Sequence, residues 1–266
     1  MNAQVAIAPA RPAPGARRTD ALTDVALTAP LFVVYHVGVA FLPLRNAADV
    51  VTSRLAELAE FNRAAYLALT VALGVFVAGV LLACGHREKF RWETFALVAL
   101  EGAVYAVAMR WAAGYVAVAL APGALSSALG LGVAPANAAF VASGLNAPLL
   151  GPAAALGASP WGAIVLSCGA GVYEELAFRV LLFGIGSRLL VAMDDWRPWL
   201  VKLAWALACA AAFSLWHHTG PMAEPFALEP FLFRTVCGLA FTAIFAFRGF
   251  APAVWTHTLY DVWVLV

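Results

Sequence analysis

The chain has 266 residues, of which 64% are hydrophobic and only 12% are charged. Soluble domains average about 45–50% apolar and about 25% charged residues, so this composition excludes an ordinary soluble domain and indicates that a lipid bilayer surrounds the chain. The net charge of +1 gives no support for a nucleic-acid partner. The cysteines lie singly in apolar runs, without a CxxC or Cys/His pairing, which is typical of small buried hydrophobic residues: Cys84, Cys168, Cys209 and Cys237.

Apolar stretches follow one another along most of the chain. Residues 1–25 are rich in Ala and Pro and are predicted to be a disordered cytoplasmic tail. A membrane helix needs about 20 mostly apolar residues, and the candidate spans are 27–44, 64–84, 94–121, 161–187, 199–217, 230–247 and 250–266. Residues 26–266 are therefore predicted to have an all-α fold, a polytopic membrane helical bundle with about seven transmembrane helices.

The connections between these spans differ in character. Residues 46–63 are predicted to form a short amphipathic helix at the membrane interface, and the uncharged, Gly- and Pro-rich segment 122–160 an irregular or re-entrant connection. Most Lys and Arg outside the spans lie in the N-terminal tail and in the loops predicted on the same side of the membrane, which predicts a cytoplasmic N-terminus. These residues are Arg11, Arg17, Arg18, Arg87, Lys89, Arg91, Arg188, Arg197, Lys202 and Arg248, and the loops on the opposite side hold only Arg45, Arg54 and Arg63.

Three ionisable residues interrupt the apolar run GVYEELAFRVLLFGIG at 171–186. A charge at the bilayer centre costs about 2.5–3.5 kcal/mol, which makes these residues functional candidates. Glu175 and Arg179 stand four apart on one helical face and are predicted to form an ion pair. Glu174 lies about 100° further round the helix, so it is not committed to that arginine and is a candidate to accept a proton from water.

Two later spans carry the other candidates. The stretch FSLWHH places His217 at the end of one span, and VWTHTLYDVW places His257 and Asp261 four apart on one face of the last. Each group alone has a structural alternative, an interfacial histidine or a packing device. Together with the glutamates they predict a site that activates water for hydrolysis, with or without a metal ion.

These motifs resemble those of a known family. EELAFR is similar to the EExxxR motif of the CPBP intramembrane proteases, which include CAAX proteases and bacteriocin-processing enzymes and are also called the Abi family. FSLWH matches the family's FxxxH, and HTLYD its third motif, HxxxN/D, in the same order. The resemblance covers residues 161–266 and implies an intramembrane endopeptidase acting on a membrane-associated protein or peptide.

The resemblance also implies roles for single residues. Glu174 would activate the attacking water, Glu175 and Arg179 would support the site, and His217 and His257 would position water or stabilise the oxyanion. Asp261 stands where type II CAAX prenyl endopeptidases have Asn. An ionised carboxylate cannot donate a hydrogen bond, so Asp261 is better suited to orient His257, to bind metal or to act in its protonated form.

The metal question and the relative heights of the residues stay open in the sequence. Glu174, His217 and His257 would suit zinc, but no HExxH motif is present, and a glutamate-only mechanism is the alternative.

On the predicted boundaries, His217 lies near the outer end of its span while Glu174 and His257 lie further in, a mismatch that approaches half a membrane. Either the fifth span starts later than predicted or water reaches the site through a cavity.

Two other classes of membrane protein are weighed against the protease. A proton-coupled carrier also buries Glu, Arg and His, but it is expected to show repeated halves, and none is visible. A non-proteolytic immunity or scaffold member of the same family is the other alternative, and the presence of both glutamates and both histidines argues against it. The Ala, Gly and Arg content indicates a bacterium, so the expected location is the cell membrane, as a multi-pass protein of the bacterial inner membrane.

Overall fold

The computed structural model describes residues 19, 21–42, 44–83, 92–120, 159–193, 197–219 and 223–266. Regular secondary structure in these ranges is helical throughout, which confirms the predicted all-α class. The predicted tail lies outside these ranges up to residue 18, as do Cys84 and residues 121–158 of the predicted irregular connection.

Most helices lie where the apolar runs predict them. They are α1 (Ala21–Phe41), α2 (Val50–Leu58), α3 (Arg63–Ala83), α4 (Trp92–Leu120), α10 (Pro198–Trp216), α11 (Leu228–Arg248) and α12 (Phe250–Leu265). The predicted interfacial helix at 46–63 is the shorter α2, whose N-terminus is capped by the Asp49 carboxylate. The fourth predicted span is one long helix made of α8 (Pro160–Gly169), η1 (Ala170–Glu174), η2 (Leu176–Ile185) and α9 (Gly186–Met193).

Six of the described helices are long and apolar enough to cross a membrane. They are α1, α3, α4, the long helix from α8 to α9, α10 and α11. Large apolar side chains on α3 face outward, with Val71, Val75 and Phe76 each about two thirds exposed. Such a surface suits lipid rather than water, so the chain is a helical membrane protein.

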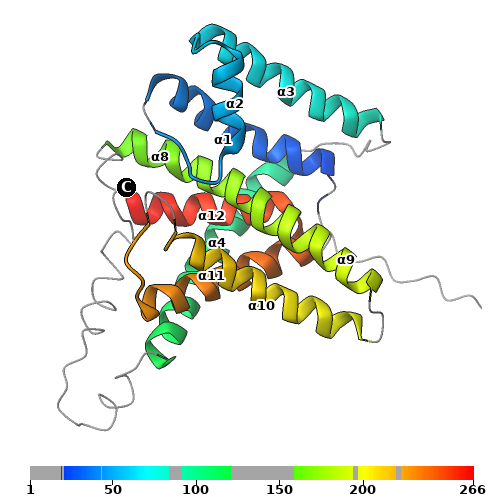
Figure 1. The fold of residues 1–266 in the computed structure, drawn as a ribbon, viewed down its shortest axis with the longest axis vertical. Coiled ribbons are helices and arrows are strands. Elements are labelled where there is room, and N and C mark those ends of the chain that lie inside the picture. The colour runs from blue at the N-terminus through cyan, green and yellow to red at the C-terminus, as the bar shows by residue number, and fades with distance from the viewer. Residues whose placement is uncertain are drawn as a thin grey trace, which may run out of the picture.

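The seventh predicted span, α12, is the centre of the bundle. With 16 residues it is shorter than the other spans, and it packs against α1, α4, α8, η1 and α11 (Figure 1). Its first turns are fully buried, with Ala251, Ala253 and Val254 at 0% exposure. Most of its surface is therefore covered by protein.

Two features fix the start of α12. Gly249 joins it to α11 with φ of 111°, a conformation that favours glycine. The carboxylate of Asp24 on α1 then accepts hydrogen bonds from the backbone N–H groups of Phe250 and Ala251, at 3.2 and 2.7 Å. Asp24 thus caps a helix that lies more than 220 residues further along the chain, which satisfies two otherwise unpaired donors.

The long helix is widened in its middle. Residues 170–174 and 176–185 follow the π-helical pattern, in which N–H groups bond five residues back instead of four. π-helical segments inside α-helices occur frequently at functional sites. Here the widened part carries Glu174 and Arg179.

Gly171 lets η1 approach α12 closely. A Cβ atom at this position would collide with Thr258 Oγ1 and lie 2.9 Å from the Val254 carbonyl oxygen. Because that carbonyl belongs to the backbone of a buried helix, it cannot move aside easily. Replacing Gly171 would push the two helices apart.

We predict that Gly171→Ala lowers the free energy of unfolding by about 1–3 kcal/mol, as overpacking does in closely packed interiors. Thermal unfolding in detergent micelles measures the effect. Gly114→Ala on α4 is the matched control, because no neighbouring atom lies within 4 Å of a Cβ atom added at Gly114. An equally stable Gly171→Ala protein would contradict the close approach of the two helices.

Candidate active site

The predicted ion pair between Glu175 and Arg179 is present and fully buried. Arg179 Nη1 lies 3.1 Å from Glu175 Oε1, and the two side chains are 1% and 0% exposed. The guanidinium lies over the rings of Phe213 and Phe241, at 4.3 and 4.9 Å from their centroids. Its Nη2 donates to the carbonyl oxygen of Gly238 at 3.5 Å. Arg179 therefore ties η2 to both α10 and α11.

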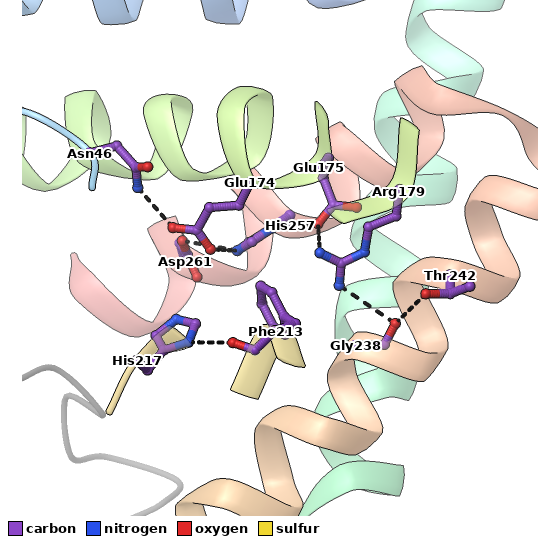
Figure 2. Close-up of polar contacts among 10 residues, drawn as sticks. All are labelled: Asn46, Glu174, Glu175, Arg179, Phe213, His217, Gly238, Thr242, His257 and Asp261. Carbon is purple, nitrogen blue, oxygen red and sulfur yellow. Dashed lines mark hydrogen bonds and ion pairs between the residues drawn. The ribbon is translucent and has the colours of Figure 1, made fainter. Parts of the chain in front are cut away.

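His257 on α12 is oriented by the same carboxylate. Its Nδ1 lies 2.7 Å from Glu175 Oε1, and its ring stacks on Phe241 with centroids 4.6 Å apart. A carboxylate paired to an arginine only accepts hydrogen bonds, so Nδ1 is the donor. This leaves Nε2 facing Glu174 and Asp261 (Figure 2).

Glu174 holds its two carboxylate oxygens in different surroundings. Oε1 accepts a hydrogen bond of 2.8 Å from Asn46 Nδ2. Oε2 is buried without a hydrogen-bond partner in the described part of the chain, and it lies 4.0 Å from His257 Nε2. A separation of 4.0 Å is too long for a direct hydrogen bond but suits two groups that share a water molecule.

Asp261 lies on the other side of the His257 imidazole from Glu175. Its Oδ2 is 3.6 Å from His257 Nε2, which is longer than a hydrogen bond. The sequence suggested that Asp261 orients His257, and the structure instead places Glu175 on the orienting nitrogen. Asp261 faces the same nitrogen as Glu174 does.

His217 follows directly after α10 and lies beside this cluster. Its Nδ1 is 3.0 Å from the carbonyl oxygen of Phe213, so Nδ1 donates and Nε2 is left available. Its ring packs edge-on against Phe213, and it is near enough to Glu174 and His257 to interact with both electrostatically. Among the described residues it makes no hydrogen bond to either of them.

The sequence predicts His217 and Glu174 at different depths in the membrane. The structure brings them to the same level, because the end of α10 lies beside the middle of the long helix. Phe213 packs against Phe178 with centroids 5.3 Å apart, and Trp205 Nε1 bonds the carbonyl oxygen of Leu182 at 2.9 Å. One turn beyond Phe213, the helix ends next to Glu174. The long helix continues past this point as α8, so α10 ends halfway along its neighbour rather than level with its end.

Asn46 is a site residue that the sequence analysis missed. It was assigned to an interfacial helix, whereas it lies in the loop before α2 and contacts Glu174. The short sequence NAAD at 46–49, with a capping aspartate three residues later, signals an ordered turn. It does not indicate which residue that turn contacts.

The other ionisable residues of the spans have partners away from the cluster. Glu101 on α4 pairs with Arg248 at 2.5 Å, which removes it from the site. Arg234 pairs with Glu224 at 2.7 Å. His36 on α1 contacts the hydroxyls of two tyrosines and is buried.

The predicted zinc ligands do not form a metal site as they lie. His217 and His257 both keep Nε2 available, which suits zinc, but in the described ranges no three His, Cys, Asp or Glu side chains are grouped so as to hold a metal ion. Zinc binding by Glu174, His217 and His257 stays a prediction.

The fold and the cluster together define a helical membrane protein with a buried site of acids and histidines. Residues 156–263 match the family model described as type II CAAX prenyl endopeptidase Rce1-like. The match confirms the resemblance found in the sequence, and the family is one of proteases that act on membrane-associated proteins. No curated protein and no solved structure matches the chain.

We predict that Arg179→Ala lowers the free energy of unfolding by about 3–5 kcal/mol, because it leaves the Glu175 carboxylate buried without its partner. Unfolding in mixed micelles measures the loss. Arg54→Ala is the matched control: Arg54 and Glu57 form an ion pair of 2.8 Å with side chains 78% and 53% exposed. That change is expected to cost less than about 1 kcal/mol, and equal effects of the two substitutions would contradict the role given to Arg179.

Proposed function

We propose that the chain is an intramembrane endopeptidase that hydrolyses a peptide bond of a membrane-associated protein or peptide with water activated by Glu174. The observation that carries the proposal is Glu174 Oε2, a buried carboxylate oxygen without a hydrogen-bond partner among the described residues, 4.0 Å from His257 Nε2. A positioned base next to an oriented imidazole is the arrangement that general-base hydrolysis needs.

In the proposed reaction, one water molecule lies between Glu174 and His257. One of its hydrogens is bonded to Glu174 Oε2 and the other to His257 Nε2, so its lone pairs point at the substrate carbonyl. As the water oxygen attacks, Glu174 takes one proton, and the carbonyl oxygen becomes an oxyanion. When the C–N bond breaks, Glu174 gives this proton to the leaving amine.

The remaining side chains support this step. Glu175 holds His257 in the tautomer with Nδ1 protonated, and Arg179 balances the charge of Glu175. His217 approaches from the side of α10 and, in its protonated form, donates from Nε2 to the oxyanion. Asp261 lies 3.6 Å from the same His257 Nε2 atom, so it borders the space in which the water lies.

The substrate class follows from the position of the site. Glu174, Glu175 and Arg179 lie on a helix that is long enough to cross a membrane, and the matching family is named for prenylated CAAX proteins. The partners proposed are therefore a membrane-anchored protein or peptide terminus and the lipid bilayer, without nucleic acid. The proposed location is the cell membrane, with the N-terminus in the cytoplasm.

We predict that Glu174→Gln lowers kcat by about 10²–10⁴ while substrate still binds, because the amide keeps the shape of the side chain but cannot take a proton. The assay uses the protein in liposomes with two fluorogenic peptides, one ending in a farnesylated CAAX sequence and one anchored by an acyl chain. Glu57→Gln on the exposed face of α2 is the control and should keep full activity. Full activity of Glu174→Gln would contradict the mechanism, and no cleavage of either peptide by the unmodified protein would contradict a protease.

The metal dependence is tested on the same preparation. We predict that cleavage survives exhaustive chelation, because the described acids and histidines are not grouped as a metal site. Metal content is measured alongside activity. Loss of activity that zinc restores would contradict the glutamate-only mechanism and would make Glu174, His217 and His257 the first ligands to test.

A further inference from the structure

Asn46 lies far from the other site residues in the sequence and outside the segment that matches the family model. It belongs to the loop between α1 and α2, yet its Nδ2 atom donates a hydrogen bond of 2.8 Å to Glu174 Oε1. Figure 2 shows this amide reaching the carboxylate from the side opposite to His217. The first part of the chain thus contributes a direct contact to the proposed base.

The direction in which the Asn46 amide points is determined by its other bonds. Its Oδ1 accepts from the backbone N–H of Ala48 at 2.8 Å, so the atom that faces Glu174 is the nitrogen, a donor. Its own backbone N–H donates to the hydroxyl of Tyr35 at 3.0 Å. That hydroxyl in turn bonds Asp49 Oδ2 at 2.7 Å, and Asp49 caps α2. The loop is therefore held at several points.

A second set of bonds fixes the loop relative to the helix that carries Glu174. Tyr173, the residue before Glu174, bonds His36 Nε2 at 2.7 Å. The Nδ1 atom of His36 bonds the hydroxyl of Tyr66 on α3 at 2.5 Å. Since His36 and Tyr35 are neighbours on α1, the same helix turn holds both the Asn46 loop and η1. The distance between the amide and the carboxylate is set by rigid elements on both sides.

We propose that Asn46 is a positioning residue for Glu174: its amide holds Oε1, so Oε2 is the oxygen that takes the proton from water. This proposal rests on the proposed function. A carboxylate that is free to rotate presents either oxygen to its surroundings, whereas one that is bonded at Oε1 keeps Oε2 directed at His257.

Two substitutions separate positioning from a merely structural contact. Asn46→Asp keeps an oxygen that accepts from Ala48, replaces the donor to Glu174 by an acceptor and adds a negative charge beside it. Asn46→Ser removes the donor without adding a charge. The matched control is Asn62→Asp, because Asn62 caps its own turn in the same way, through a bond of 3.0 Å from the Ala65 N–H, and the structure shows no contact between it and Glu174.

The first measurement is the pH profile of peptide cleavage. A hydrogen bond to a charged group is worth enough that both Asn46 variants should lose about 10–100-fold in kcat with little change in KM. The acidic limb of kcat/KM should move to higher pH by about 1–2 units. The other charged groups that face Glu174 are unchanged in all variants, namely Arg179 on its own helix, His217 after α10, and His257 and Asp261 on α12. An unshifted limb with a normal kcat would overturn the proposal.

The second measurement needs no substrate, so it distinguishes failure of this inference from failure of the proposed function. Infrared titration of the protonated carboxyl band, taken as the difference from Glu174→Gln, follows Glu174 directly. In Asn46→Ser the midpoint should move to higher pH by the same amount. A folded variant with an unchanged midpoint overturns the inference even if the unmodified protein is an active protease. If the midpoint shifts but the unmodified protein cleaves neither peptide, the contact between Asn46 and Glu174 is supported and only the proposed protease function is contradicted. Should Asn46→Ser unfold, Asn46→Asp, which keeps the bond from Ala48, takes its place, and an unshifted acidic limb of kcat/KM in that variant overturns the inference.

Discussion

The buried ion pair between Glu175 and Arg179 is the interaction on which the rest of the site depends. An unpaired charge among apolar helices costs several kcal/mol, so neither residue tolerates loss of the other. The pair lets the guanidinium lie between Phe213 and Phe241, which joins three helices. The same Glu175 oxygen also accepts the bond from His257. One carboxylate therefore both stabilises the bundle and sets the tautomer of the histidine.

The helices were predictable because the bilayer limits what an apolar run can be. The fifth span, predicted at 199–217, begins and ends within one residue of α10. The long helix was predicted to end at 187 and ends at Met193, because its last turns carry one charged residue, Arg188, among apolar ones. The shift of α10 along this helix was not predictable, since composition says which residues cross the membrane and not where neighbouring helices stop relative to one another.

In the site, contacts between residues close in the sequence were predictable, and contacts between distant residues were not. The pairing of Glu175 with Arg179 could be predicted from their spacing, because residues four apart on a helix are neighbours. The partner of His257 could not, because Glu175 and Asp261 are both carboxylates, and only the packing of η1 against α12 decides which reaches Nδ1. Asn46 had no signal of its own, since a polar residue before a helix cap is common in any loop.

The cap that Asp24 places on α12 links the order of synthesis to the order of assembly. Asp24 belongs to the first described helix to leave the ribosome, and its two acceptor positions are filled by backbone groups made more than 220 residues later. The carboxylates of the long helix enter the membrane before His257 exists. A nascent chain therefore holds the acids without the histidine, and the candidate site is completed only after α12 has been made and packs against the other helices.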